Sequence, residues 1–307
     1  MNLRVTSKII LQHILSNIPK GTDINFFFQT VKKGGLRVHF LEKVLNAGKH
    51  LDKYLEYTEL KNPFDGKIYE LGAGRNLTIS LTFFGFGINY QIVTDIRKLI
   101  RANLLNDTLN KFKEKKDEVE RMGKIKRQPG QYLMSFTDGR EIQQLHEYFG
   151  IHYIAPIDTG NTRFESESFD FIFSTVTLEH IPLHVLKAIF KECRRILKHN
   201  GIMSHIIDLR DHFSCFDGRV SPYNFLTYPD FSWKFLNPWL HYQNRLRHKD
   251  YIDLAIKSGF SILEDNFEVP AVEDINCLKR LRIHHDFQTY PMEELAIKQV
   301  HLVLRKE

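Results

Sequence analysis

The sequence of 307 residues predicts an α/β fold built on a parallel sheet. Short apolar runs alternate with helical stretches from Lys67 onward, as in chains of strand–helix–strand units. A glycine-containing bend, Gly72-Ala73-Gly74, follows the first of these runs, and acidic residues stand where later runs end. The composition, 42% apolar and 26% charged, is that of a globular protein with a full core.

The first 60 residues carry no strong strand signal and are predicted to form a helical N-terminal extension or lid. Within them, Leu36–Tyr57 spaces its apolar residues near 3.6 positions apart. The main domain is predicted to span residues 61–307. The sequence shows neither a secretory signal nor an apolar run of about 18 residues, so we expect a cytoplasmic protein.

From residue 61 onward, patterning predicts each strand and helix in turn. The predicted strands are Lys67–Leu71, Tyr90–Thr94, a strand near His152–Ala155, Phe169–Ser174, Ile202–Asp208, Ile262–Val269 and Val300–Arg305. The predicted helices are Asn76–Phe84, Pro182–Leu197 and His248–Lys257. Asn200-Gly201 is expected to stop the second of these helices. The segment Lys98–Gly150 is too long for a simple connection and is predicted to be an insertion, at about residues 98–150.

Charge and cysteine content exclude several classes of protein. The net charge is +6, but the densest basic run, Lys111–Arg127, interleaves acids and indicates a solvated surface. A nucleic-acid partner would require a coherent basic face, so none is expected. The three cysteines are scattered without metal-ligand spacing, which excludes a disulfide framework and a zinc knuckle.

The bend after the first strand indicates the kind of ligand. Glycines at Gly72 and Gly74 allow a tight turn and close approach of a ligand to the backbone. Leu77 occupies the third glycine position of a dinucleotide fingerprint, so that fingerprint fails. Glu70, two residues before Gly72, would repel a pyrophosphate and favour a ligand with an ammonium group. S-adenosylmethionine is such a ligand, whereas a nicotinamide dinucleotide is not.

Two further acids follow later strands. Asp95 comes at the end of the second strand, where a carboxylate can accept both hydroxyls of a ribose. Asp158 follows the next apolar stretch and is predicted to accept an adenine amine. Both could instead be helix or turn caps.

Taken in order, these blocks resemble the class I S-adenosylmethionine-dependent methyltransferases. The resemblance runs from Ile68 to Asp208 and includes Ser168–Ser174, Leu178–Pro182 and Arg194–Gly201. It implies a Rossmann-like, mostly parallel seven-stranded sheet of order 3-2-1-4-5-7-6 with helices on both faces, and S-adenosyl-L-methionine as cofactor. The cofactor-binding residues implied by the resemblance and by the acids are Glu70, Gly72, Ala73, Gly74, Asp95, Ile96, Asp158 and Ser174. The long insertion and Asn200 depart from the family pattern.

Acceptor chemistry is expected after the fourth and fifth strands. His212 is predicted to remove the acceptor proton, oriented by Asp211 or Asp208; a capping aspartate beside a surface histidine is the alternative. Glu179-His180 resembles a metal-binding element of some relatives, but Val176 replaces its other glutamate. No metal is therefore expected there, and His180 is predicted to be a packed pocket-wall residue.

The segment Tyr223–Arg247 is rich in aromatic residues and suits either a sugar acceptor or a cap on the sheet. Its Arg245 and Arg247 could hold a carboxylate or phosphate. We therefore predict O-methylation of a small molecule or a sugar, in glycan biosynthesis. An RNA methyltransferase and a non-catalytic S-adenosylmethionine-binding protein are the alternatives.

Overall fold

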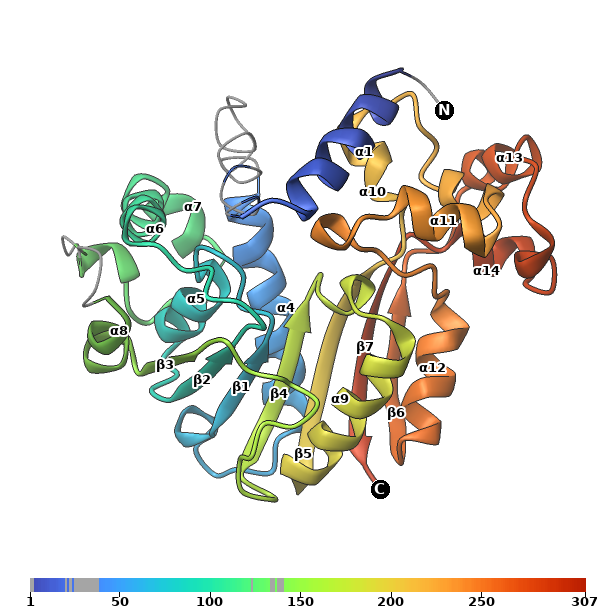
Figure 1. The fold of residues 1–307 in the computed structure, drawn as a ribbon. Coiled ribbons are helices and arrows are strands. Elements are labelled where there is room, and N and C mark those ends of the chain that lie inside the picture. The colour runs from blue at the N-terminus through green and yellow to red at the C-terminus, as the bar shows by residue number, and fades with distance from the viewer. Residues whose placement is uncertain are drawn as a thin grey trace.

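The computed structural model describes residues 3–19, 21, 24, 39–122, 124–132, 136 and 141–307. It contains a seven-stranded sheet with helices on both faces (Figure 1). The strands are β1 (Ile68–Leu71), β2 (Gln91–Thr94), β3 (Ile151–Ile154), β4 (Phe169–Thr175), β5 (Leu197–Asp208), β6 (Phe260–Phe267) and β7 (Gln299–Lys306). Their order is β3-β2-β1-β4-β5-β7-β6, which confirms the prediction.

The first five strands run parallel, and β7 lies antiparallel between β5 and β6. The carboxyl ends of β1, β2, β3, β4 and β5 therefore share one edge of the sheet. In sheets of this kind, ligands bind beyond that edge.

Each face of the sheet has its own apolar layer. Helices α9 (Leu183–Ile196) and α12 (His248–Lys257) cover one face, and α4 (Phe40–Tyr57) and α5 (Thr78–Phe86) cover the other. Strand β1 alternates between them: Tyr69 and Leu71 join the α9 layer, whereas Ile68 joins the α4 and α5 layer. Glu70 points the same way as Ile68, because side chains two residues apart on a strand share a face.

One predicted boundary is wrong. Helix α9 ends at Ile196 and β5 begins directly at Leu197, so Asn200-Gly201 lies inside the strand and does not stop the helix. Pairing with β4 shifts there, from Phe169 opposite Leu197 to Phe171 opposite Ile202. A Cβ on Gly201 would lie 2.7 Å from Leu197 Cδ1. This glycine therefore permits a close approach within an irregular strand pair.

The segment between β2 and β3 folds mainly as helices. These are α6 (Ala102–Glu114), α7 (Lys116–Glu120) and α8 (Glu141–Phe149). Leu109, Phe112 and Val119 join a buried cluster with residues of α4 and α5. Lys115 pairs with Glu118 at 2.6 Å on the exposed side of this segment, as expected for a solvated charged surface. The segment thus covers the β3 end of the sheet.

A smaller cluster of helices lies over the carboxyl ends of β4 and β5 (Figure 1). It contains α1 (Leu3–Ser16), α10 (His212–Phe216), α11 (Asp230–Leu236), α13 (Val272–Lys279) and α14 (Met292–Ala296). Short 3-10 helices complete the chain: η1 (Pro63–Asp65), η2 (Pro129–Gln131), η3 (Leu178–His180), η4 (Asn224–Thr227), η5 (Trp239–His241) and η6 (His285–Phe287). Among the described helices, none has the length and apolar character needed to cross a membrane.

Candidate functional site

A cavity of about 430 Å³ lies at the carboxyl ends of β1 to β4. Four loops that follow these strands form its walls, and η5 forms its far side. The residues that line it are Leu71, Gly72, Asp95, Ile96, Arg97, Leu99, Asp158, Thr159, Val176, Thr177, Leu178, His180, Ile181, Pro182, Val185, Ile189, Trp239, Leu240, His241 and Tyr242. A concave, mostly apolar cavity with a few polar groups is typical of small-molecule sites.

The glycine bend forms one wall because its backbone is held against β2. The amides of Gly72 and Ala73 both donate to the carbonyl of Thr94, at 3.0 Å. Gly72 has a φ of 78°, and a Cβ there would lie 2.4 Å from Thr177 Cγ2. Gly74 has a φ of 68° and open space where a Cβ would point. The bend therefore needs glycine at Gly72 for packing and leaves room for a ligand at Gly74.

Asp95 lies beside this bend, at the predicted position after β2. Its Oδ2 accepts from the Gly74 amide at 3.2 Å and its Oδ1 from the Arg97 amide at 3.1 Å. Burial raises its pKa. Each carboxylate oxygen has a further lone pair, so the group can accept ligand hydroxyls while it braces the loop. Ile96, 69% exposed, lines the same wall.

Asp158 lies on the cavity wall with Thr159. Its Oδ1 accepts from the Gly160 amide at 2.9 Å, which is the turn-capping geometry that the sequence left as an alternative. The cap uses only part of the acceptor capacity of the carboxylate, so capping and ligand contact are compatible.

Four of the residues predicted to bind the cofactor do not line the cavity: Ala73 and Gly74, which belong to the bend beside it, and Glu70 and Ser174, which are buried within the sheet. Glu70 is buried on the α5 side of the sheet, where its Oε2 accepts from Ser80 Oγ at 2.5 Å. Burial raises the pKa of Glu70 to about 7, against the nearby positive charge of Lys43. Ser174 is fully buried within β4, and its hydroxyl bonds to His205 Nδ1 at 2.8 Å. Thr177 and Val176, a few residues later, reach the cavity instead.

Histidines gather at the η5 side of the cavity. His180 lines the wall, and its Nδ1 lies 2.8 Å from the carbonyl oxygen of Tyr242. Because a carbonyl can only accept, Nδ1 carries the hydrogen and the other ring nitrogen, Nε2, is a bare acceptor. His241 also lines the cavity, and burial lowers its pKa well below the usual value.

His212 lies directly behind this wall, with its ring centroid 4.9 Å from that of His180 and 5.9 Å from that of His241. Burial and the neighbouring His180 lower its pKa to about 4, so the ring is neutral near pH 7. Its Nε2 is 3.9 Å from Asp208 Oδ2.

Asp211 has the capping role that the sequence left open as the alternative to orienting His212. It caps α10: its Oδ1 accepts from the Phe213 amide at 2.8 Å and its Oδ2 from Asn224 at 3.3 Å. Of the two aspartates considered for orienting His212, Asp208 is the one whose carboxylate lies near the imidazole ring, with Oδ2 3.9 Å from Nε2. Asp208 itself is held by Arg210, through Nε at 2.9 Å and Nη2 at 2.8 Å.

The aromatic segment after β5 serves mainly as a cap. Trp233 and Phe225 are buried in the small helical cluster, while Trp239 and Tyr242 line the cavity. The expectation that Arg245 or Arg247 holds an anionic ligand is not met. Arg247 is fully buried, and Arg245 donates to the carbonyls of Phe225 and Tyr228 and to Asp230.

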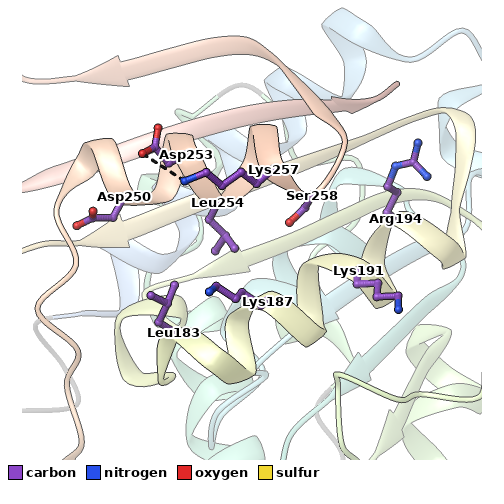
Figure 2. A pocket seen from close by; sticks show the side chains of 9 residues that line it. All are labelled: Leu183, Lys187, Lys191, Arg194, Asp250, Asp253, Leu254, Lys257 and Ser258. Carbon is purple, nitrogen blue, oxygen red and sulfur yellow. Dashed lines mark ion pairs between the residues drawn. The ribbon is translucent and has the colours of Figure 1, made fainter.

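A second cavity, of about 570 Å³, lies between α9 and α12 (Figure 2). Lys187 and Arg194 line it from α9, and Asp250 and Lys257 line it from α12. It lies along the outer helices of the sheet rather than at the strand ends. The groups that could position a reacting molecule are therefore those of the first cavity.

Sequence reasoning considered the whole segment Tyr223–Arg247 for an acceptor or a cap, but it did not single out Trp239 to Tyr242, which form the η5 side of the cavity. Their aromatic composition was visible, but no spacing rule indicated that this stretch returns to the loops after β1 to β4. The predicted wall position of His180 is confirmed.

One protein family matches part of the sheet described above. Residues 141–204 match the family described as Methyltransferase domain. The matched segment contains β3, β4, α9 and the first part of β5. No curated protein matches the chain.

Several solved structures resemble it in outline. One is a S-adenosylmethionine-dependent methyltransferase from Methanosarcina mazei, with 14% identity, 82% and 95% of the two chains covered, and a TM-score of 0.46. Another is the geranyl diphosphate C-methyltransferase of Streptomyces coelicolor, with 10% identity, 85% and 77% covered, and a TM-score of 0.45. A third is phosphoethanolamine N-methyltransferase 2 of Haemonchus contortus, with 15% identity, 84% and 52% covered, and a TM-score of 0.43. At these values the similarity does not identify an acceptor.

Proposed function

We propose that this chain is a S-adenosylmethionine-dependent methyltransferase whose acceptor is a hydroxyl group of a small molecule or a sugar. The observation that carries the proposal is the position of Asp95 beside the glycine bend, facing a cavity at the carboxyl ends of the strands. The methyltransferase-domain match over residues 141–204 supports the same reaction class.

The cavity offers suitable groups for each part of the cofactor. The proposed contacts are Asp95 with the ribose hydroxyls, Ile96 with the adenine face, and Asp158 with the adenine amine. Open space at Gly74 leaves the bend accessible to the amino-acid end. When bound, the cofactor supplies a methyl group already activated by its sulfonium, so the protein has mainly to align the acceptor.

The choice of a hydroxyl acceptor rests on the neutral imidazoles at the η5 side. A hydroxyl must lose its proton on methylation, and a neutral histidine near the acceptor can take it. His180 and His212 both have lowered pKa values. We propose that this pair receives the proton, with Asp208 near His212. Replacement of His212 by Gln is then expected to lower turnover at saturating cofactor, and near-normal turnover would contradict the assignment.

The cofactor assignment can be tested by calorimetry with S-adenosylhomocysteine. We expect wild-type protein to bind it and Asp95→Asn to weaken binding about 10-fold or more, because a hydrogen bond to a charged group contributes about 1.5–3 kcal/mol. Asp117→Asn, on the exposed insertion, is the matched control and should bind normally. Binding of NADH without binding of S-adenosylhomocysteine would overturn the proposal. Labelled cofactor incubated with cell extract would then identify the acceptor fraction.

A further inference from the structure

Three potential metal ligands converge at the η5 side of the cavity: His180 lines the cavity, and Glu179 and His212 lie behind it. One ligand atom from each of Glu179, His180 and His212 lies within 4.8 Å of the other two. An ion with bonds of about 2.1 Å in tetrahedral geometry separates its ligands by about 3.4 Å. Side-chain adjustments of about 1 Å would therefore bring these atoms to binding distance.

Glu179 is an unusual group to find in this position. It is 1% exposed, and neither carboxylate oxygen has a hydrogen bond of good geometry among the described residues, although the backbone N–H groups of Glu179 itself and of Asp208 lie near it. Arg210 acts on it through its charge, but its guanidinium forms a bidentate ion pair with Asp208. A buried carboxylate with so few partners is costly, and a bound cation would offset that cost.

Hydrogen bonds and packing position both histidines. His180 is oriented by its Nδ1 hydrogen bond to the Tyr242 carbonyl, which leaves Nε2 bare; metal-binding histidines in proteins commonly carry such a second hydrogen bond. The ring centroid of His212 lies 4.9 Å from that of His180, so the two imidazoles are close enough to share an ion after small side-chain adjustments.

Hydrogen bonds from residues 243 and 244 connect η3, which carries Glu179 and His180, to α10, which begins at His212. The backbone amide of Asn244 donates to the Glu179 carbonyl at 2.7 Å, and its side chain donates to the Leu178 carbonyl at 2.9 Å. Its neighbour Gln243 accepts from the His212 amide at 3.1 Å. One short segment thus links η3 to α10, so the three ligands belong to a braced arrangement rather than to independent loops.

We propose that Glu179, His180 and His212 bind a divalent transition-metal ion, such as Zn²⁺, at the acceptor end of the cavity. Two imidazoles and one carboxylate suit transition metals rather than Mg²⁺ or Ca²⁺, which prefer oxygen ligands. The sequence led us to expect no metal, because Val176 replaces a second glutamate. In the structure, His212 at the start of α10 comes close enough to Glu179 and His180 to be a third potential ligand.

Binding of the ion does not depend on methyl transfer, but its use in catalysis rests on the proposed function. An ion here would lower the pKa of a hydroxyl bound to it. In the metal-bound protein His180 and His212 would be ligands, and the proton of the bound hydroxyl would pass to water. The general-base role proposed above for the two histidines applies to the metal-free protein.

The test is calorimetry of metal-stripped full-length protein with Zn²⁺ and, separately, Co²⁺. We expect one equivalent to bind to the wild type, and Glu179→Gln and His212→Gln to weaken binding at least 10-fold. His285→Gln is the matched control: His284, His285 and Asp286 form the other potential metal cluster among the described residues, on the surface. It should leave binding unchanged. Unchanged binding in Glu179→Gln and His212→Gln, or loss in His285→Gln, would overturn the proposal.

X-ray absorption of the Co²⁺-loaded wild type provides a measurement that does not depend on the variants folding. Two imidazoles and further oxygen ligands are expected, and fewer than two imidazoles or any sulfur ligand would overturn the proposal. Parallel titration with S-adenosylhomocysteine separates the two ideas. If that ligand binds while neither metal does, only the metal site is wrong; if a metal binds at these residues while that ligand does not, only the proposed function is wrong.

Discussion

Asp208 and Asp211 stand three positions apart, yet their carboxylates have unrelated partners. Asp208 forms a two-point pair with Arg210 and lies 3.9 Å from His212, whereas Asp211 caps α10. Burial raises the pKa of Asp211 to about 6, opposed by its hydrogen bonds to Phe213 and Asn224. Residue type therefore predicts what a side chain can do, and its neighbours decide which of those roles it has.

Glu70 provides a prediction at this scale. Burial raises its pKa to about 7, so near pH 7 the carboxyl is about half protonated. A ligand ammonium placed near the bend would favour the ionised form and lower that pKa. Binding of S-adenosylhomocysteine at pH 7 is therefore expected to release up to about half a proton.

Calorimetry in two buffers with different ionisation enthalpies measures this release. Glu70→Gln should abolish it, and Glu42→Gln, an exposed residue of α4, should leave it intact. Equal proton release by the wild type and Glu70→Gln would show that the Glu70 carboxyl does not respond to the ligand.

At the scale of elements, buried polar groups connect strands to the loops that surround the site. Arg247, before α12, donates to the carbonyls of Leu209 at 2.8 Å, Leu295 at 3.1 Å and Ile297 at 2.8 Å. It joins the end of β5 to the segment that enters β7. The position of α10, and with it His212, follows from this connection.

Replacement of Arg247 by Met is expected to destabilise the fold by about 3 kcal/mol or more, because buried carbonyls left without donors cost about 1–3 kcal/mol each. Urea unfolding measures the change. Arg247→Lys should recover only part of it, since an ammonium cannot reproduce the planar arrangement of the guanidinium. Arg280→Met, at an exposed residue at the end of α13, is the control and should leave the free energy of unfolding nearly unchanged. A small effect in Arg247→Met would show that these bonds do not hold the elements together.

At the scale of the whole molecule, a polar network crosses the middle of the sheet and ties α4 to it. His50 of α4 bonds to Ser204 Oγ at 2.7 Å and to Thr175 Oγ1 at 3.0 Å, and Ser204 also bonds to His301 at 2.7 Å. His205, whose side chain points to the opposite face of β5, bonds to Ser174 Oγ at 2.8 Å and packs against Phe190 of α9. Burial lowers the pKa of His205 to about 3 and that of His301 to about 4.

This network predicts sensitivity to acid. Each of these histidines stays neutral in the folded protein but takes up a proton below about pH 6.5 when unfolded, so their contribution to stability is complete above pH 6.5. It is lost as pH falls toward 4 and 3, with a slope approaching about 1.4 kcal/mol per pH unit for each histidine. Urea unfolding between pH 7 and pH 5 measures the slope.

His205→Asn should reduce that slope, and His199→Asn, an exposed residue, should not. If the slope were unchanged in His205→Asn, another group would account for the acid sensitivity.

The sequence by itself determined the glycine bend and the placing of Asp95 and Asp158 after strands, because these depend on periodicity and on spacing from strand ends. The strand order followed from the resemblance of the sequence blocks to a known family. Only the tertiary structure decided that Glu70 faces away from the cavity, that Ser174 is buried against His205, and that Glu179, His180 and His212 converge. The alternation of residues along a strand specifies which side chains share a face of the sheet. The meeting of side chains from different loops depends instead on the path of loops such as 237–247, and long-range hydrogen bonds that local spacing does not encode set that path.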